Sequence, residues 1–121
     1  LTTIGDGAFN GCDSLVEVNI PGSVTSIGDY AFSECKTLKT MYIPYKLKSI
    51  GSNSFFGCRS LERITIPASV ESIAQGAFSY CENLQGITVD KRNKFYCGNG
   101  DCIVDIKKEK KRKKKKRKLR R

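Results

Sequence analysis

The sequence predicts an α/β-type repeat solenoid of mainly short parallel β-strands with helical turns, built of four coils and a C-terminal cap. Three observations predict this fold class: a fixed period of 23 residues, apolar residues that recur in register, and a strand-like alternation that ends at proline. A period between about 20 and 50 residues is typical of solenoids. The rows that match after a shift of 23 residues are Ile4/Ile27/Ile50/Ile73, Phe9/Phe32/Phe55/Phe78, Cys12/Cys35/Cys58/Cys81 and Leu15/Leu38/Leu61/Leu84.

Each unit changes its local pattern along its length; the four units span residues 1–23, 24–46, 47–69 and 70–92. Towards the end of a unit, L-x-x-I-x-I alternates with a period of two, which indicates a strand with one buried face. Proline follows in the first three units and ends the strand, because it has no N–H to give to a ladder. The next stretch, V-T-S-I in the second unit, predicts a short extended segment that leads to Gly28, where the chain can turn. The residues of Asp29–Ser33 then predict a helical turn.

A single unit cannot bury its own apolar side, but stacked units can. When equivalent strands pair in parallel, the apolar rows line up about 4.7–4.9 Å apart. Three repeats are usually the minimum for stability. With four coils we therefore expect a thin core with weak ends.

The repeat resembles a known family. L-x-x-I-x-I-P, followed by V-x-x-I-G-x-x-A-F-x-x-C-x-x-L, is similar to the BspA-like class of leucine-rich repeats over residues 1–92. This resemblance implies a parallel-stranded solenoid with a concave strand face, and a role in surface recognition or adhesion at the cell surface or after secretion. The chain has no recognisable signal peptide or transmembrane segment and begins in mid-pattern at Leu1, so we expect it to be a piece of a longer protein.

The repeat pattern lapses after Val89, and residues 93–106 are the candidate irregular C-terminal cap. Apolar residues on both sides of Gly98–Asp101 predict a small hairpin. Cys97 and Cys102 flank this turn. Across a hairpin they would face each other and form a disulfide in an exported protein, whereas in a reducing compartment they would be ordinary cap residues.

The cysteine row at Cys12, Cys35, Cys58 and Cys81 predicts core packing. Free cysteine behaves as a small, often buried hydrophobic residue. Residues in a row do not converge tetrahedrally, and the chain has no histidine, so we expect no metal site. Side chains that project in parallel fit the disulfide dihedral badly, so we expect free thiols.

The sequence indicates a protein that is not an enzyme and binds no cofactor or small-molecule substrate. Without histidine, the usual base that activates a nucleophile is missing. Gly98-Asn99-Gly100 lacks the lysine and serine of a phosphate-binding loop and the spacing of a dinucleotide fingerprint. Acidic residues are scattered rather than paired.

The outward positions of the longer strands are the candidate partner-binding surface. On leucine-rich repeats, this concave row commonly meets a protein partner. Tyrosine and arginine, here Tyr42 and Arg63 on neighbouring coils, are enriched at interface hot spots. The alternative is that threonine and tyrosine merely suit exposed strand positions. The candidate residues are Glu17, Asn19, Thr40, Tyr42, Arg63, Thr65 and Thr88.

The positive charge is concentrated in residues 107–121. This tail holds 13 of the 22 Lys and Arg residues against one acidic residue, which leaves 9 basic and 11 acidic residues for the rest. Like charges at i, i+4 repel, so we expect the free tail to be disordered. It is either a solvated end or a polyanion-binding segment that contacts nucleic acid without specificity, directs nuclear import, or meets an anionic membrane. The candidate contact residues are Lys110, Lys111, Arg112, Lys113, Lys114, Lys115, Lys116, Arg117 and Lys118.

Overall fold

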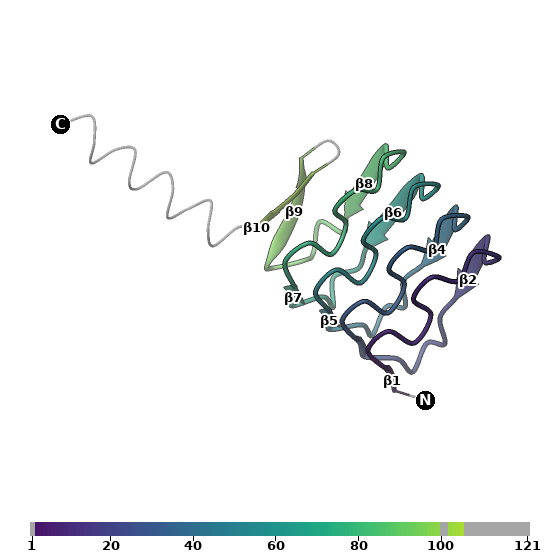
Figure 1. Cartoon of the computed structure of the whole chain (residues 1–121). Coiled ribbons are helices and arrows are strands. Elements are labelled where there is room, and N and C mark those ends of the chain that lie inside the picture. Colours follow the sequence, from purple (N-terminus) through teal and green to yellow (C-terminus); the bar gives the residue numbers. More distant parts are fainter. Residues whose placement is uncertain (1, 100–101, 106–121) are drawn as a thin grey trace.

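The computed structural model describes residues 2–99 and 102–105. Its first parallel sheet contains β1 (Thr3–Ile4), β3 (Ser26–Ile27), β5 (Ser49–Ile50) and β7 (Ser72–Ile73). The second contains β2 (Glu17–Asn19), β4 (Thr40–Tyr42), β6 (Arg63–Ile66) and β8 (Gly86–Val89). An antiparallel hairpin of β9 (Tyr96–Asn99) and β10 (Cys102–Asp105) follows. Figure 1 shows four coils side by side in one row, with the hairpin next to β8. The prediction of a parallel-stranded solenoid is confirmed.

The register of both sheets equals the sequence period. Thr3 pairs with Ser26, Ser26 with Ser49 and Ser49 with Ser72, each 23 residues further along the chain. Because the offset is constant, side chains at equivalent positions lie above one another. The 23-residue rows of the sequence are therefore physical columns in the structure.

The phenylalanine row forms one such column. The rings of Phe9, Phe32, Phe55 and Phe78 lie 5.2–5.4 Å apart between centroids and within 10° of parallel. Phe32 and Phe55 are fully buried, whereas Phe9 at the first coil is 39% exposed. Burial of a large apolar side chain contributes about 1.5–3 kcal/mol, so the inner coils carry most of the core energy.

Between its short strand and its longer strand, each coil forms a series of turns. The prediction of a helical turn in this stretch is wrong. We call this stretch the turn side; it comprises residues 5–12, 28–35, 51–58 and 74–81. Alternate amides donate to the next coil: Gly7 to Asp29 at 2.8 Å and Phe9 to Ala31 at 2.7 Å. The amide of Ala8, which lies between them, donates to the carbonyl of Gly5 within its own coil. In a helix, every backbone amide would donate within its own coil. Here alternate amides donate to the next coil, so the hydrogen bonds also join the coils to each other.

The alternation requires left-handed backbone at two positions in every coil. One position is the row Gly7, Tyr30, Asn53 and Gly76, with φ from 53° to 73°. The other is the row Gly11, Glu34, Gly57 and Tyr80, with φ from 59° to 73°. Non-glycine residues adopt this conformation only at some cost, so the stacking bonds hold them there.

Gly28 is needed for close approach rather than for a positive φ. A Cβ atom at this position would lie 2.5 Å from Asp6 Oδ1 and 2.7 Å from the Asp6 backbone nitrogen. The Asp6 carboxylate also accepts a hydrogen bond from the Asp29 amide at 2.8 Å. The corner thus presses one coil against the next, and a side chain would separate them.

The cysteine row packs in the core as free thiols. The Sγ atoms of Cys35, Cys58 and Cys81 each donate to a phenylalanine carbonyl of the preceding coil at 3.1 Å. The hydrogen bond with Cys81, together with burial, raises the pKa of the Cys58 thiol, and burial raises that of Cys35. These two thiols therefore remain protonated at neutral pH.

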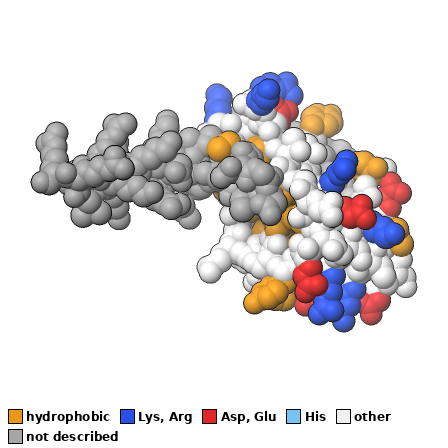
Figure 2. Space-filling model, turned by 90° about the horizontal axis from the view of Figure 1, so that it is seen from above, with side chains coloured by type: hydrophobic (Ala, Val, Ile, Leu, Met, Phe, Trp, Pro, Cys, Tyr) orange, Lys and Arg blue, Asp and Glu red, His pale blue; other side chains and the backbone are white. Residues whose placement is uncertain are grey.

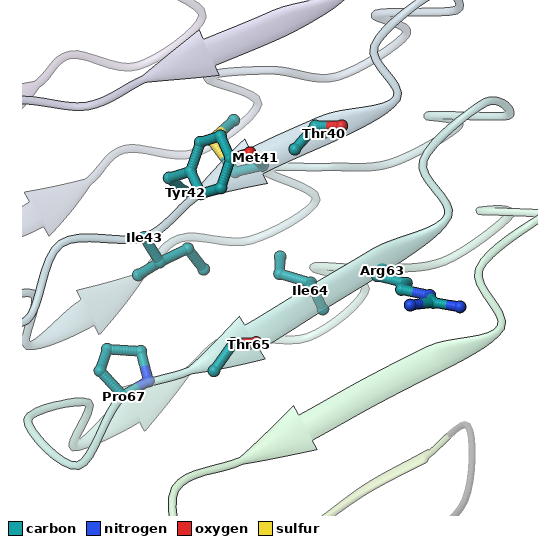
Figure 3. Close-up of a pocket in the computed structure, with 8 residues that line it drawn as sticks. All are labelled: Thr40, Met41, Tyr42, Ile43, Arg63, Ile64, Thr65 and Pro67. Carbon is teal, nitrogen blue, oxygen red and sulfur yellow. The ribbon is translucent and has the colours of Figure 1, made fainter.

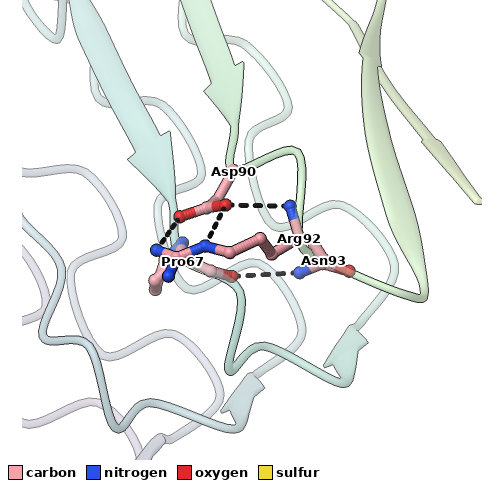
Figure 4. Close-up of polar contacts among 4 residues, drawn as sticks. All are labelled: Pro67, Asp90, Arg92 and Asn93. Atoms are coloured by element: carbon pink, nitrogen blue, oxygen red, sulfur yellow. Dashed lines mark hydrogen bonds and ion pairs between the residues drawn. The ribbon is translucent and has the colours of Figure 1, made fainter.

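Asn93 begins the segment that covers the last coil. It is 5% exposed and occupies the register of Val70 in the preceding unit. Its Nδ2 atom donates to the carbonyls of Pro67 and Val70, each at 3.0 Å, and its Oδ1 atom accepts from the amides of Phe95 and Tyr96 at 2.8 and 2.9 Å. Figure 4 shows the amide reaching across to Pro67. One side chain thus joins the fourth coil to the start of the hairpin.

A further hydrogen bond joins this segment to the fourth coil, and an ion pair lies directly before the segment. The Tyr96 hydroxyl accepts a hydrogen bond from the Ile73 amide at 2.8 Å, on the last strand of the short-strand sheet. Asp90 and Arg92 form an ion pair at 2.9 Å, and the Arg92 guanidinium hydrogen bond lowers the pKa of Asp90 to about 2.

The hairpin register differs from the one expected at the cysteines. Cys97 lies opposite Val104, and Cys102 lies opposite Asn99. The expectation that the two cysteines face each other directly is therefore wrong, because the turn is shorter than Gly98–Asp101. Cys97 is an exposed free cysteine.

Ser54 is the one buried side chain in the described residues whose polar atom has no hydrogen-bond partner. Its equivalents in the other coils are Ala8, Ala31 and Ala77. An unpaired buried hydroxyl costs about 1–3 kcal/mol, so Ser54→Ala should raise the free energy of unfolding by about 1 kcal/mol in urea denaturation. The reverse change, Ala31→Ser, creates the same unpaired hydroxyl and should lower it. Stabilisation by Ala31→Ser would contradict this explanation.

Candidate binding face on the longer strands

The outward side chains of β2, β4, β6 and β8 form a continuous surface, which we call the strand face. Every predicted partner-binding residue lies on it: Glu17, Asn19, Thr40, Tyr42, Arg63, Thr65 and Thr88. Thr40 is half-buried and the other six are exposed. Alternation along each strand produces this result, because Met41, Ile64 and Ile87 point into the core between them.

A pocket of about 250 Å³ lies on this face between β4 and β6. Four of the predicted residues line it: Thr40, Tyr42, Arg63 and Thr65. Figure 3 shows Tyr42 over the end of β4, while Arg63 projects from the opposite end of the pocket. The register explains this separation, because Thr40 rather than Tyr42 is the direct neighbour of Arg63. The structure therefore brings the two predicted hot-spot residues to one pocket without placing them in contact.

The Arg63 side chain lies against Gly86 of the neighbouring coil. A Cβ atom at Gly86 would lie 3.4 Å from Arg63 Cγ and 3.9 Å from Cδ, which are ordinary van der Waals distances. The aliphatic stem of Arg63 therefore lies over β8, and a small side chain at position 86 would also fit beneath it.

Sequence reasoning missed the apolar lining of this pocket. Ile43 and Pro67, which follow β4 and β6, also line it. They come after the strands end, where alternation no longer tells which way a side chain points. The signal that could have found them is the constant spacing of strand and proline in the first three 23-residue units.

The charges on the surface have mixed sign. Figure 2 shows basic and acidic side chains next to one another on the visible face, with single apolar side chains between them. On the strand face, Glu17 and Arg63 lie on alternate coils with Thr40 between them. Such a face favours a partner with both charged and polar groups over a uniform polyanion.

No group of acidic residues and cysteines in the described part of the chain could hold a metal ion. The predicted tail contacts, Lys110–Lys118, lie outside the described residues. Within residues 2–99 and 102–105, no helix is long and apolar enough to cross a membrane.

Two stacked parallel ladders, a 23-residue register and an outward strand face define a solenoid of the leucine-rich repeat class. The chain belongs to the BspA-type leucine-rich repeat family, whose six-copy repeat region matches residues 1–99. The family match extends past the four units of residues 1–92 into the hairpin. Proteins of this family are generally non-enzymatic.

Solved structures of bacterial proteins share the fold. A leucine-rich cell surface protein from Faecalibacterium prausnitzii is 35% identical with a TM-score of 0.78, over 84% of this chain and 26% of that one. A leucine-rich repeat protein from Bacteroides capillosus is 34% identical with a TM-score of 0.69, over 74% and 64%. The pneumococcal vaccine antigen PcpA is 26% identical with a TM-score of 0.79, over 88% and 26%. The chain thus spans about a quarter of the Faecalibacterium and pneumococcal proteins. The comparison with curated proteins gave no match.

Proposed function

We propose that this chain is a non-enzymatic binding module that holds a protein partner on its strand face, in a surface-recognition or adhesion role. The observation that carries the proposal is the pocket between β4 and β6. It joins an exposed tyrosine, an arginine and two threonine hydroxyls in about 250 Å³ on an otherwise regular sheet.

The side chains of this pocket suit a protein surface. Tyr42 is 53% exposed, so its ring offers apolar area that a partner would bury at little entropic cost. Arg63 offers a planar donor group for carboxylates or backbone carbonyls. Tyrosine and arginine are the residue types that most often dominate binding energy at interfaces.

The rigid backbone beneath the pocket also favours binding. Thr40 of β4 pairs with Arg63 of β6, and β6 in turn pairs with β8 at four positions. A surface held by strand pairing loses little conformational freedom when a partner binds.

A cell-surface location is part of the proposal. The Faecalibacterium relative is described as a cell surface protein and the pneumococcal relative as a vaccine antigen. The chain covers about a quarter of each of these proteins, and the proposed location rests on the repeat region that it shares with them.

The test uses a purified partner, obtained by affinity capture on the wild-type chain and then measured against variants by biolayer interferometry. Tyr42→Ala and Arg63→Ala should each weaken binding by about tenfold or more, as expected for hot-spot residues. Circular dichroism should show that both variants keep the fold, because both side chains are exposed.

The controls are two exposed residues that line neither pocket, Tyr30 on the turn side and Lys36 directly after it. Tyr30→Ala and Lys36→Ala remove a tyrosine and a basic residue away from the strand face, and the partner should bind both variants like wild type. If the control pair weakens binding and the strand-face pair does not, the strand face is not the binding surface.

The charge distribution favours a second candidate function, in which the basic tail binds polyanions and the solenoid carries it. The tail has 13 basic residues of 15, whereas the remaining residues have a small acidic excess. Phosphate contacts of this kind are steeply salt-dependent. Deletion of residues 107–121 should abolish retention on DNA or RNA at low salt and leave partner binding on the strand face unchanged. Loss of partner binding in this deletion would show that the strand face is not the surface that holds the partner.

A further inference from the structure

A second hollow, of about 210 Å³, lies on the turn side of the second to fourth coils. None of its lining residues belongs to the strand-face pocket. We call it the turn-side pocket; its lining residues are Glu34, Phe56, Gly57, Arg59, Tyr80 and Glu82.

One wall of the pocket depends on a glycine in the third coil. Glu34, Gly57 and Tyr80 occupy the same left-handed position in three successive coils, with φ of 59°, 71° and 60°. The Glu34 carboxylate extends over Gly57, where a Cβ atom would come within 2.7 Å of its Oε1 atom. The Glu34 carboxylate therefore occupies the space over Gly57 and forms one wall of the pocket, whose lining also includes Tyr80.

The walls of the turn-side pocket combine aromatic rings with carboxylates. The rings of Phe56 and Tyr80 meet edge to face at 5.2 Å and 63°, and Tyr80 is 71% exposed. Glu34 and Glu82 have no ion-pair partner among the described residues, where the ion pair found is Asp90–Arg92. Arg59 contributes one positive charge, which leaves the lining with a formal charge of −1.

An aromatic face beside a carboxylate is a binding site for an ammonium or guanidinium group. Cations within about 6 Å of an aromatic ring centroid are attracted by its negative face. The same contact occurs elsewhere in the chain, where the Lys46 ammonium lies 5.9 Å from the centroid of the Tyr45 ring. The ligand that fits the turn-side pocket is therefore a lysine or arginine side chain.

We propose that the basic tail of the same chain, residues 107–121, supplies this side chain. The tail carries 13 lysines and arginines and begins shortly after β10, whose partner β9 contacts β8 in the fourth coil. Fifteen extended residues reach up to about 50 Å. Tyr80 and Glu82 belong to the fourth coil itself, and neighbouring coils lie only about 4.7–4.9 Å apart. Tethering raises the effective concentration to about the millimolar range, so even a weak pairing is populated.

When the tail fills the turn-side pocket, both the tail and the pocket become less available to other partners. A tail held on the solenoid presents fewer free charges to a polyanion, and an external basic segment competes for the same pocket. The contact between exposed charges weakens as salt rises.

Backbone NMR of the full chain tests the proposal between about 20 and about 500 mM salt, where the Debye length falls from roughly 20 Å to about 4 Å. The amides of Glu34, Gly57 and Tyr80 should shift with salt in the wild type. In the combined variant Lys113→Gln, Lys114→Gln, Lys115→Gln and Lys116→Gln, the chemical shifts of these amides at low salt should already be close to those of the wild type at high salt.

The reciprocal variant joins Glu34→Gln with Glu82→Gln and should move the tail resonances to their high-salt positions. The control joins Glu62→Gln with Glu71→Gln, two exposed glutamates outside both pockets, and should leave the tail resonances unchanged. Equal tail shifts in both pairs, or pocket shifts that do not depend on the tail lysines, would overturn the proposal. Pocket shifts that grow with protein concentration would assign the contact to the tail of a second copy and overturn it too.

Discussion

Replacing Phe55 with alanine should lower the free energy of unfolding by about 3–5 kcal/mol, the cost usual for a buried phenylalanine. Phe55 is fully buried and stacks on Phe32 and Phe78, so its removal leaves a cavity with a ring on each side. Domains of this size are stable by only about 5–15 kcal/mol. Urea denaturation followed by circular dichroism measures the change.

Phe9→Ala is the matched control, because within the described part of the chain Phe9 stacks on one ring, that of Phe32, and is 39% exposed. Its loss removes less buried surface, so the free energy of unfolding should fall by roughly half as much or less. Equal losses for Phe9→Ala and Phe55→Ala would contradict the idea that stability comes from columns covered on both sides by neighbouring coils.

Asn93→Ala should lower the free energy of unfolding by about 3 kcal/mol or more. The side chain makes four hydrogen bonds, and its removal leaves the carbonyls of Pro67 and Val70 and the amides of Phe95 and Tyr96 without this partner. Each buried polar group left unpaired costs about 1–3 kcal/mol. Thermal unfolding and urea denaturation both measure the effect.

Asn93→Leu separates hydrogen bonding from packing. Leucine restores the kind of apolar residue that Leu47 provides in this register, and it fills the space without satisfying the four polar groups. It should remain strongly destabilising, whereas Asn83→Ala, at an exposed site, should change stability by less than about 0.5 kcal/mol. Wild-type stability in Asn93→Leu would show that the hydrogen bonds are dispensable.

The strands could be predicted from the sequence because period and register are the same quantity in a solenoid. Once Ile4 and Ile27 are 23 residues apart in equivalent units, parallel pairing places them side by side. The inward and outward positions then follow from alternation, which is why Tyr42 and Arg63 were placed correctly on the exposed face.

The turn side could not be predicted from local residue preferences. Asp29–Ser33 resembles the start of a helix, but three of its five amides donate to a neighbouring coil, and no local pattern encodes that choice. Glycine at Gly7 and Gly57 marks the left-handed positions, whereas Tyr30 and Glu34 conceal them in the second coil. Comparing the glycines across units, rather than within one, would have identified the turns.

The site was predictable in its outward residues but not in its shape. The pocket depends on Ile43 and Pro67, which lie beyond the strand ends. The hairpin shows the same limit, because the length of its turn, and not the spacing of Cys97 and Cys102, sets the register.

The most direct test of partner binding on the strand face is an NMR map of the chain with its purified partner. The largest shift changes should fall on Thr40, Tyr42, Arg63 and Thr65, with smaller changes on β2 and β8. Changes confined to the turn side or to the short strands β1, β3, β5 and β7, with β4 and β6 unaltered, would contradict the proposal.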